Sequence, residues 1–344
     1  MKGMNVAQTE ECVTASAFTL VELLVVISII AMLIAILAPS LAGVKDLAKA
    51  AVCSSNLRNV GLAVNVYSTT YKVFPASYVY PNNPDGSFNL LDQPADHPYG
   101  YLHWSYALYN MGQSTNFNAF QCPGITNGGA PRTNPGPQAG DWGDGQVDQN
   151  GQSTPNALTD FQAPRVAFAA NAALMPRNKF TTALSGGQRI NQFVSPDRVG
   201  GTSGVILSAE IESWPAMAIQ EGGGLLLKSH RPINPFTHVG AGTNEYAAPL
   251  NTPGFIYGAA GSTDSGLLSY DQTKEMQGLI DGSAGAEINT VARRHAGGND
   301  KYGGAANFLY CDGHVDRKTV KATLAGREWG DRYYSLTGAN QVLP

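Results

Sequence analysis

A long apolar run near the N-terminus constrains this chain more than any other feature. From Leu23 to Val44 the sequence has 22 consecutive residues without a charge, and a helix of that length can cross the hydrocarbon core of a bilayer. A second apolar stretch, Phe18–Val21, precedes the run, and Glu22 lies between the two. The sequence therefore predicts a membrane-embedded helix with one acidic residue near its start.

Glu22 requires an explanation of its own. A carboxylate at the start of a membrane helix is costly unless it finds a partner. Proteolysis immediately before Phe18 would create a positive α-amino group, and this amine on a neighbouring copy could pair with Glu22 in surroundings of low dielectric constant. The pattern predicts cleavage between Ala17 and Phe18, followed by a charge pair that sets the register between subunits.

The segment Ala17–Ile27 (AFTLVELLVVI) closely resembles the class III signal of type IV pilins and type II secretion pseudopilins. Ala17 stands where that family usually has glycine. The resemblance implies that a membrane prepilin peptidase cleaves the chain and methylates the new N-terminus. It assigns processing or assembly roles to Ala17, Phe18, Thr19, Leu20, Glu22 and Pro39.

Two other interpretations of the N-terminus are open. Ser40-Leu41-Ala42 resembles a secretory cleavage site, which would release a soluble protein beginning at Gly43. The run could also be a plain membrane anchor. The apolar run is longer than the about 7–15 residues of a secretory signal core, and neither alternative explains Glu22, so the prepilin interpretation is favoured.

Apolar residues continue beyond the run in steps of three and four, which is typical of one helix face. They are Val44, Leu47, Ala48, Ala51, Leu57, Val60, Val64, Tyr67 and Tyr71. We expect one helix from about residue 19 to 72, bent near Pro39. The expected organisation is a leader (1–17), a transmembrane helix (18–43), an amphipathic continuation (44–74) and a globular domain (75–344).

The remainder of the chain predicts short strands separated by long loops. Gly124–Asn156 is rich in Gly, Pro, Asn and Gln and is expected to be a loop region. Val205–Glu210 is typical of a buried strand that ends in an acid. Asp312-Gly313 between two strand-like segments predicts a hairpin. The expected fold is α+β and pilin-like, with the long helix packed on a small antiparallel β-sheet that carries large loop insertions.

Several segments together resemble the H-X9-DG (DUF1559-like) subfamily of pilin-like proteins of planctomycete-type bacteria. That subfamily is named for a C-terminal His followed by nine residues and Asp-Gly, whereas here 16 residues (296–311) separate the two. The matching segments are Cys53–Ala63, Phe120–Pro123, Leu207–Glu210, Arg294-His295, Asn307-Phe308 and Asp312–Val315.

His295, Asp312 and His314 could be metal ligands or a hydrolytic pair. The favoured interpretation is structural: Asp312-Gly313 forms a turn, and His295 hydrogen-bonds a loop backbone. No HExxH-like helix and no Gly-x-Ser-x-Gly elbow is present in the sequence. No catalytic, metal or cofactor residue is therefore predicted.

Two further features leave alternatives open. The oxygen-rich segment Asp141–Gly151 could hold a structural calcium ion, as similar pseudopilins often do, but it lacks an EF-hand pattern, and a solvated loop is favoured. Cys12 lies in the expected leader. The remaining cysteines, Cys53, Cys122 and Cys311, allow three pairings, and the sequence does not choose among them.

The combined interpretation is a non-enzymatic subunit of a type II secretion pseudopilus or a type IV pilus-like filament. Its expected partners are a prepilin peptidase/N-methyltransferase, other pilin-like subunits and inner-membrane lipid. With 22 Lys+Arg against 26 Asp+Glu, no nucleic-acid partner is expected. We expect a single-pass protein of the bacterial inner membrane with an extracytoplasmic C-terminal domain. The alternatives are an anchored binding module that does not polymerise and an exported metal-dependent enzyme.

Overall fold

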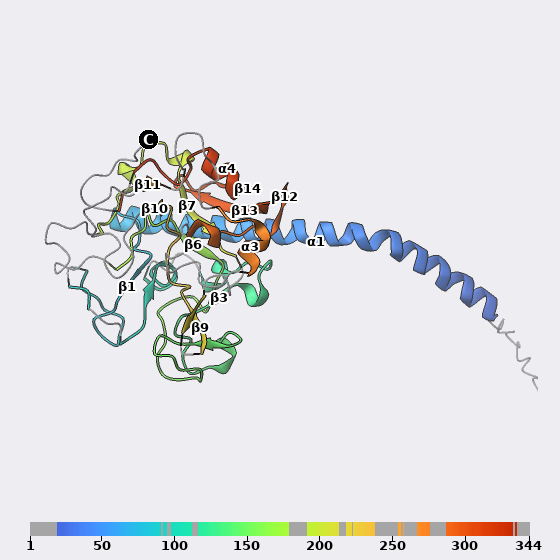
Figure 1. Ribbon diagram of the computed structural model, residues 1–344, viewed down its shortest axis with the longest axis horizontal. Helices are drawn as coiled ribbons and strands as arrows, with labels where there is room; N and C mark the ends of the chain where they lie inside the picture. The colour runs from blue at the N-terminus through green and yellow to red at the C-terminus, as the bar shows by residue number, and fades with distance from the viewer. Residues whose placement is uncertain are drawn as a thin grey trace, which may run out of the picture. The chain divides into compact units, whose positions relative to one another are not determined.

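The fold is described by a computed structural model (Figure 1). The structure describes residues 19–90, 92–94, 98–111, 116–178, 191–212, 218–221, 223–237, 254, 255, 257, 267–275, 287–332, 334 and 335. The chain divides into two compact units, Met1–Lys45 and Asp46–Pro344. Ala17 and Phe18, the predicted cleavage positions, lie outside the described residues.

Helix α1 spans Leu20–Tyr71 and includes Pro39. Its bounds are within one residue of the predicted ones at both ends. Lys72, with φ of 64°, adopts the left-handed conformation that commonly follows the last turn of a helix. In its first stretch, Leu20–Ala38, no residue is buried, and mean hydropathy is 3.1.

The second stretch of α1, Asp46–Tyr71, buries one face. The buried apolar side chains are Ala50, Cys53, Leu57, Val60, Ala63 and Val64, each at most 2% exposed. The predicted apolar stripe is correct for Leu57, Val60 and Val64, and Tyr67 is half-buried. It is wrong for five positions that are exposed: Val44, Leu47, Ala48, Ala51 and Tyr71. The buried face passes through the small residues Ala50 and Cys53, whose positions hydrophobicity alone does not distinguish.

The largest sheet among the described residues has five strands, all paired antiparallel. Its strands are β6 (Phe168–Ala170), β7 (Ile206–Glu210), β12 (His295–Asp300), β13 (Gly303–Tyr310) and β14 (Val315–Thr319). β14 pairs with one edge of β13, and β7 and β12 share the other edge. The predicted small antiparallel sheet is therefore confirmed, as is the predicted strand 205–210.

Shorter elements surround this sheet. They are β1 (Tyr78–Val79), β2 (Leu102–His103), β3 (Ala130–Pro131), β4 (Gln146–Val147), β5 (Arg165–Val166), β8 (Ala218–Glu221), β9 (Gly224–Leu227), β10 (Phe236–Thr237), β11 (Gly254–Phe255), α2 (Trp104–Tyr106), α3 (Tyr270–Glu275) and α4 (Val320–Ala325). The π-helix η1 (Ala107–Met111) follows α2. Single 3₁₀ turns are η2 (Phe117–Phe120), η3 (Thr126–Gly128), η4 (Ala139–Asp141), η6 (Pro196–Arg198), η7 (Thr202–Gly204) and η9 (Glu287–Thr290). Segment 124–156 contains only two-residue strands and 3₁₀ turns, as its composition predicts.

The second stretch of α1 packs directly on β13 (Figure 1). A Cβ atom placed on Gly61 would lie only 2.6 Å from Leu309 Cδ1, so glycine is what permits this close approach. The Asn307 side-chain amide donates to the Ala50 carbonyl of the helix (3.3 Å). Helix and sheet therefore meet along β13, and the candidate site lies at this junction.

Candidate functional site

The N-terminal part of α1 is long and apolar enough to cross a membrane. A single membrane anchor and a signal sequence both fit this observation. The large apolar side chains from Leu20 to Leu37 are each at least 46% exposed. Packing against other described residues of the chain therefore buries none of them.

Glu22 has a partner within its own helix. Its Oε2 accepts from the Thr19 backbone N–H (2.9 Å) and the Thr19 hydroxyl (2.8 Å), while the Glu22 N–H donates to Thr19 Oγ1 (3.2 Å). This reciprocal arrangement is a capping box, which satisfies backbone donors at a helix N-terminus. Glu22 therefore has a local role besides the predicted pairing with a neighbouring copy's amine, which stays a prediction.

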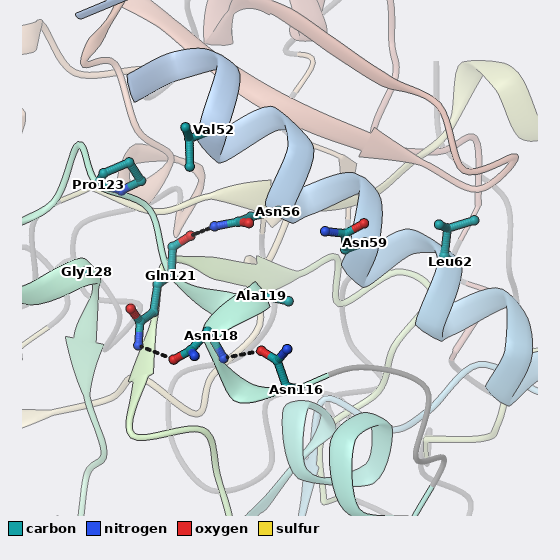
Figure 2. A pocket seen from close by; sticks show the side chains of 10 residues that line it. All are labelled: Val52, Asn56, Asn59, Leu62, Asn116, Asn118, Ala119, Gln121, Pro123 and Gly128. Atoms are coloured by element: carbon teal, nitrogen blue, oxygen red, sulfur yellow. Dashed lines mark hydrogen bonds between the residues drawn. The ribbon is translucent and has the colours of Figure 1, made fainter. Parts of the chain in front are cut away.

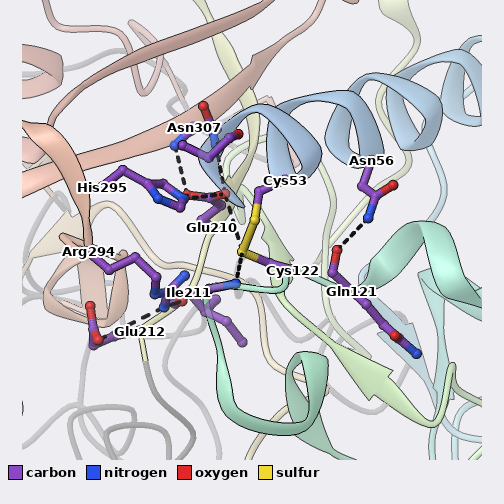
Figure 3. The surroundings of a disulfide bond; sticks show 12 residues. Cys53, Asn56, Gln121, Cys122, Glu210, Ile211, Glu212, Arg294, His295 and Asn307 are labelled. Atoms are coloured by element: carbon purple, nitrogen blue, oxygen red, sulfur yellow. Dashed lines mark hydrogen bonds and ion pairs between the residues drawn. A yellow bond between two sulfur atoms is a disulfide. The ribbon is translucent and has the colours of Figure 1, made fainter. Parts of the chain in front are cut away.

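A second candidate site lies in the core of the globular unit (Figure 3). Four buried side chains, Cys53, Cys122, Glu210 and His295, bring their ligand-type atoms within 4.8 Å of one another. Cys53 lies on α1, Cys122 follows η2, Glu210 ends β7 and His295 begins β12. Because four distant segments supply these residues, only the folded domain assembles the cluster.

The two cysteines of this cluster form a disulfide between residues 69 apart in sequence, with a Cα–Cα distance of 4.8 Å. The structure thereby selects one of the three pairings that the sequence allows. Cys311 is buried and keeps a free thiol, and burial raises the pKa of that thiol. The disulfide links α1 to the segment that follows η2.

Glu210 is the polar centre of the cluster. His295 Nε2 lies 3.0 Å from Glu210 Oε2 and 3.2 Å from Oε1. Asn307 donates its backbone N–H to Oε2 (2.9 Å) and its side-chain amide to Oε1 (2.8 Å). When Glu210 is ionised, His295 Nε2 is the donor in this contact, since an ionised carboxylate only accepts hydrogen bonds. The expectation that His295 bonds a loop backbone is wrong, because its partner is a buried carboxylate on β7.

The predicted Asp312-Gly313 hairpin is present between β13 and β14. Asp312 Oδ1 accepts from the His314 backbone N–H (3.0 Å) and lies 2.6 Å from His314 Nδ1. Gly313 has φ of 90°, a conformation that glycine adopts without steric cost.

His295 and Asp312 do not form one site. His295 lies opposite Ala305 in the β12–β13 register, and Asp312 lies beyond the far end of β13. At about 3.3 Å per strand residue, the two are roughly 20 Å apart. The hydrolytic pair considered from the sequence is therefore not assembled, although His295 does take part in a different cluster.

A family model described as a protein of unknown function (DUF1559), SBP_bac_10, matches residues 45–302. The chain belongs to this family. Comparison with curated proteins and with solved structures found no match. Within this DUF1559 chain the match includes Cys53, Cys122, Glu210 and His295, and it begins after the apolar stretch Leu20–Ala38.

The sequence segments that carry the DUF1559-like resemblance meet in the folded domain. Cys53, Cys122, Glu210, His295 and Asn307 each come from one of those segments. The first four form the disulfide cluster, and Asn307 donates to its Glu210. The sequence analysis noted Glu210 as a strand-ending acid but did not pair it with His295. Their separation of 85 residues leaves no local pattern that could have indicated the pair.

In the oxygen-rich segment 141–151, the carboxylates of Asp141 and Asp148 are engaged by nearby residues. Asp148 Oδ1 accepts from the backbone N–H groups of Asn150 and Gln152 (2.8 Å each), and Oδ2 accepts from the Asn156 amide (2.8 Å). Asp141 pairs with Arg132 at 3.7 Å. Hydrogen bonds within the loop therefore account for the buried Asp148.

An uncharged groove of about 640 Å³ (Figure 2) is lined in part by Val52 and Pro123, which are the chain neighbours of the disulfide cysteines Cys53 and Cys122. Carboxamides dominate its polar lining, including Asn56, Asn59, Asn118 and Gln121. The Asn56 side chain on α1 donates to the Gln121 backbone carbonyl (2.8 Å). This bond adds to the neighbouring disulfide in holding α1 against the segment after η2.

Proposed function

We propose that this DUF1559 protein is a pilin-like structural subunit, processed before Phe18 and assembled through the first stretch of α1. The observation that carries the proposal is the exposure of that stretch on every side. Apolar side chains that the chain itself does not bury need lipid or other copies of the same helix. A subunit that moves from membrane to filament would use both in turn.

Two features support this proposal over a secretory signal, and a third bears on the side of the membrane. The segment Ala17–Ile27 resembles prepilin signals. The helix continues without interruption from the apolar stretch to Tyr71, so cleavage before Gly43 would cut within it. The Cys53–Cys122 disulfide fits an oxidising extracytoplasmic compartment, and we place the globular unit on that side of a bacterial inner membrane.

The first test is the mass and N-terminal sequence of the mature protein. A prepilin-like subunit begins with N-methylated Phe18. A mature chain beginning at Gly43 would contradict the proposal and identify a secretory signal. An uncleaved chain would leave a plain membrane anchor.

The second test separates the two roles of Glu22. Glutamine also completes a capping box but carries no charge, so Glu22→Gln keeps the local role and removes the ionic one. If Glu22 pairs with a neighbour's amine, Glu22→Gln and Glu22→Ala both abolish co-assembly, measured by cross-linking in the membrane. Normal assembly of Glu22→Gln would contradict an ionic register role.

The second candidate function is a membrane-anchored binding module that does not polymerise. The capping box favours it, because Thr19 already accounts for the Glu22 carboxylate. The uncharged groove beside Asn56 would be its binding surface. A module of this kind should remain monomeric in the membrane and tolerate both Glu22 variants.

A further inference from the structure

The Cys53–Cys122 disulfide is surrounded by two polar side chains, Glu210 and His295, which a disulfide does not need for its own stability. Cys53, Cys122 and Glu210 are fully buried, and His295 is 4% exposed. A buried hydrogen-bonded pair such as Glu210–His295 is commonly no more stabilising than apolar side chains of the same shape. A structural disulfide alone therefore gives no reason for a carboxylate and an imidazole beside its sulfur atoms.

We propose that, when the disulfide is reduced, these four residues bind one thiophilic divalent metal ion, Zn²⁺ by the chemistry of its ligands. Two thiolates, one imidazole nitrogen and one carboxylate oxygen are all zinc donors, and four of them complete a tetrahedral site. Bond lengths of about 2.0–2.3 Å place tetrahedral ligands about 3.3–3.8 Å apart. The four donors here lie within 4.8 Å of one another, so small side-chain movements suffice.

The conversion from the disulfide form to the zinc-bound form takes two steps, reduction and metal binding. A dithiol reductant transfers two electrons and two protons to the disulfide, giving two Cys thiols and a new disulfide on the reductant. Zn²⁺ then binds both sulfurs with release of the two thiol protons. The hydrogen on His295 Nε2 moves to Nδ1, so that Nε2 becomes a ligand, and Glu210 binds in its ionised form.

Surrounding groups are arranged as the outer shell of a metal site usually is. The Gly124 backbone N–H points at Cys122 Sγ (3.4 Å), a contact that stabilises a thiolate. Asn307 holds both oxygens of Glu210 through its backbone and side-chain N–H groups. These contacts fix the orientation of two of the four ligands before a metal arrives.

A cation lies beside the cluster. A Cβ atom placed on Gly124 would lie 3.0 Å from Arg294 Cδ, 3.3 Å from Cys122 Sγ and 3.4 Å from His295 Cε1, so these three side chains converge on one point. Arg294 Nη1 is buried and has no hydrogen-bond partner among the described residues. Zn²⁺ with two thiolates and one carboxylate carries one net negative charge. The Arg294 guanidinium, whose Nη2 lies 3.9 Å from Glu212 Oε1, would face that charge through Nη1.

The test uses the full chain in detergent, with Co²⁺ as a spectroscopic probe and Zn²⁺ as competitor. Protein reduced with a phosphine, which adds no competing thiol, should bind one Co²⁺ per chain with thiolate-to-cobalt charge-transfer absorption, and Zn²⁺ should displace it. The disulfide form should show no such absorption. Reduced protein without this absorption would overturn the proposal.

Variants locate the site. His295→Ala and Glu210→Gln should weaken Co²⁺ binding by at least about a hundredfold, whereas the matched control Cys311→Ser should bind as wild type does. Equal binding by Cys53→Ser/Cys122→Ser would overturn the assignment. Because these core variants could unfold, a second measurement uses wild type alone: Zn²⁺ should raise the unfolding temperature of the reduced form and leave that of the disulfide form unchanged. An unshifted reduced form would also overturn the proposal.

Discussion

The two stretches of helix α1 have the same secondary structure and opposite surroundings. Along Leu20–Ala38 no residue is buried, and large apolar side chains are exposed all round. Along Asp46–Tyr71 one face is buried against the globular core and the other faces solvent. The comparison teaches that one continuous helix has two environments. The chain's own sheet buries the second stretch, whereas the first has no buried residue.

Removing the disulfide, which ties only the second stretch of α1 to the globular core, should cause the largest loss in the free energy of unfolding. Cys53→Ser/Cys122→Ser frees a loop closed by residues 69 apart, which in the chain-entropy model lowers the free energy of unfolding by about 4 kcal/mol. Denaturant unfolding of the full chain in detergent measures the loss. The matched control Cys311→Ser, outside the disulfide, should cost less. Equal stability of the double variant and wild type would show that α1 is held by packing alone.

Truncating one leucine in each stretch should change the free energy of unfolding by different amounts, both smaller than the effect of removing the disulfide. Leu57 is fully buried and Leu33 is 55% exposed. Leu57→Ala should lower the free energy of unfolding of the globular unit by about 3 kcal/mol, while Leu33→Ala should change it by less than about 0.5 kcal/mol. Denaturant midpoints of the two variants give the comparison. Comparable losses would mean that the first stretch also packs within the folded chain.

Protonation of the buried His103 should destabilise the globular unit in acid. The first stretch of α1, Leu20–Ala38, contains no histidine and should not respond in this way. Burial lowers the pKa of His103 to about 3, and its Nδ1 accepts from the Ser105 N–H (3.2 Å). The unfolded state therefore binds this proton more readily, and the contribution to stability is lost as pH falls below about 6.5. Between pH 7 and 5 the loss is about 2 kcal/mol.

The variant His103→Asn isolates this effect from that of other groups. Burial raises the pKa of Asp160 to about 6, so protonation of Asp160 stabilises the folded state as pH falls through that value. Subtracting the pH profile of His103→Asn from that of wild type removes the Asp160 contribution. Identical slopes in the two proteins would exclude His103 as the acid-sensitive group.

The smallest effect compares one substitution at two glycines of α1. Gly43 has open space around it, whereas a Cβ atom on Gly61 would press on Leu309. Gly43→Ala should stabilise the helix by up to about 1 kcal/mol, and Gly61→Ala should lower the free energy of unfolding by about 1 kcal/mol through overpacking. Helical content by circular dichroism and denaturant midpoints measure both. A shared sign would mean that Leu309 moves aside without cost.

Local patterns predicted the features that neighbouring residues control. The apolar run and the steps of three and four that follow it predicted α1 to within a residue at each end. The dipeptide Asp312-Gly313 predicted the hairpin, because the glycine adopts the positive φ that the turn needs. The phase of the buried helix face was predicted only in part, since Ala50 and Cys53 are small and their burial depends on what packs against them.

By itself, the sequence determined the apolar stretch, the length of α1, the strand ending at Glu210 and the C-terminal hairpin, since a pattern of neighbouring residues marks each of them. Only the tertiary structure decided that Cys53 pairs with Cys122, that His295 faces Glu210 rather than Asp312, and that Asn307 orients that carboxylate. These partners lie 69 to 97 residues apart. They meet because β7, β12, β13 and α1 pack into one core, and no short-range periodicity encodes which side chains that packing brings together.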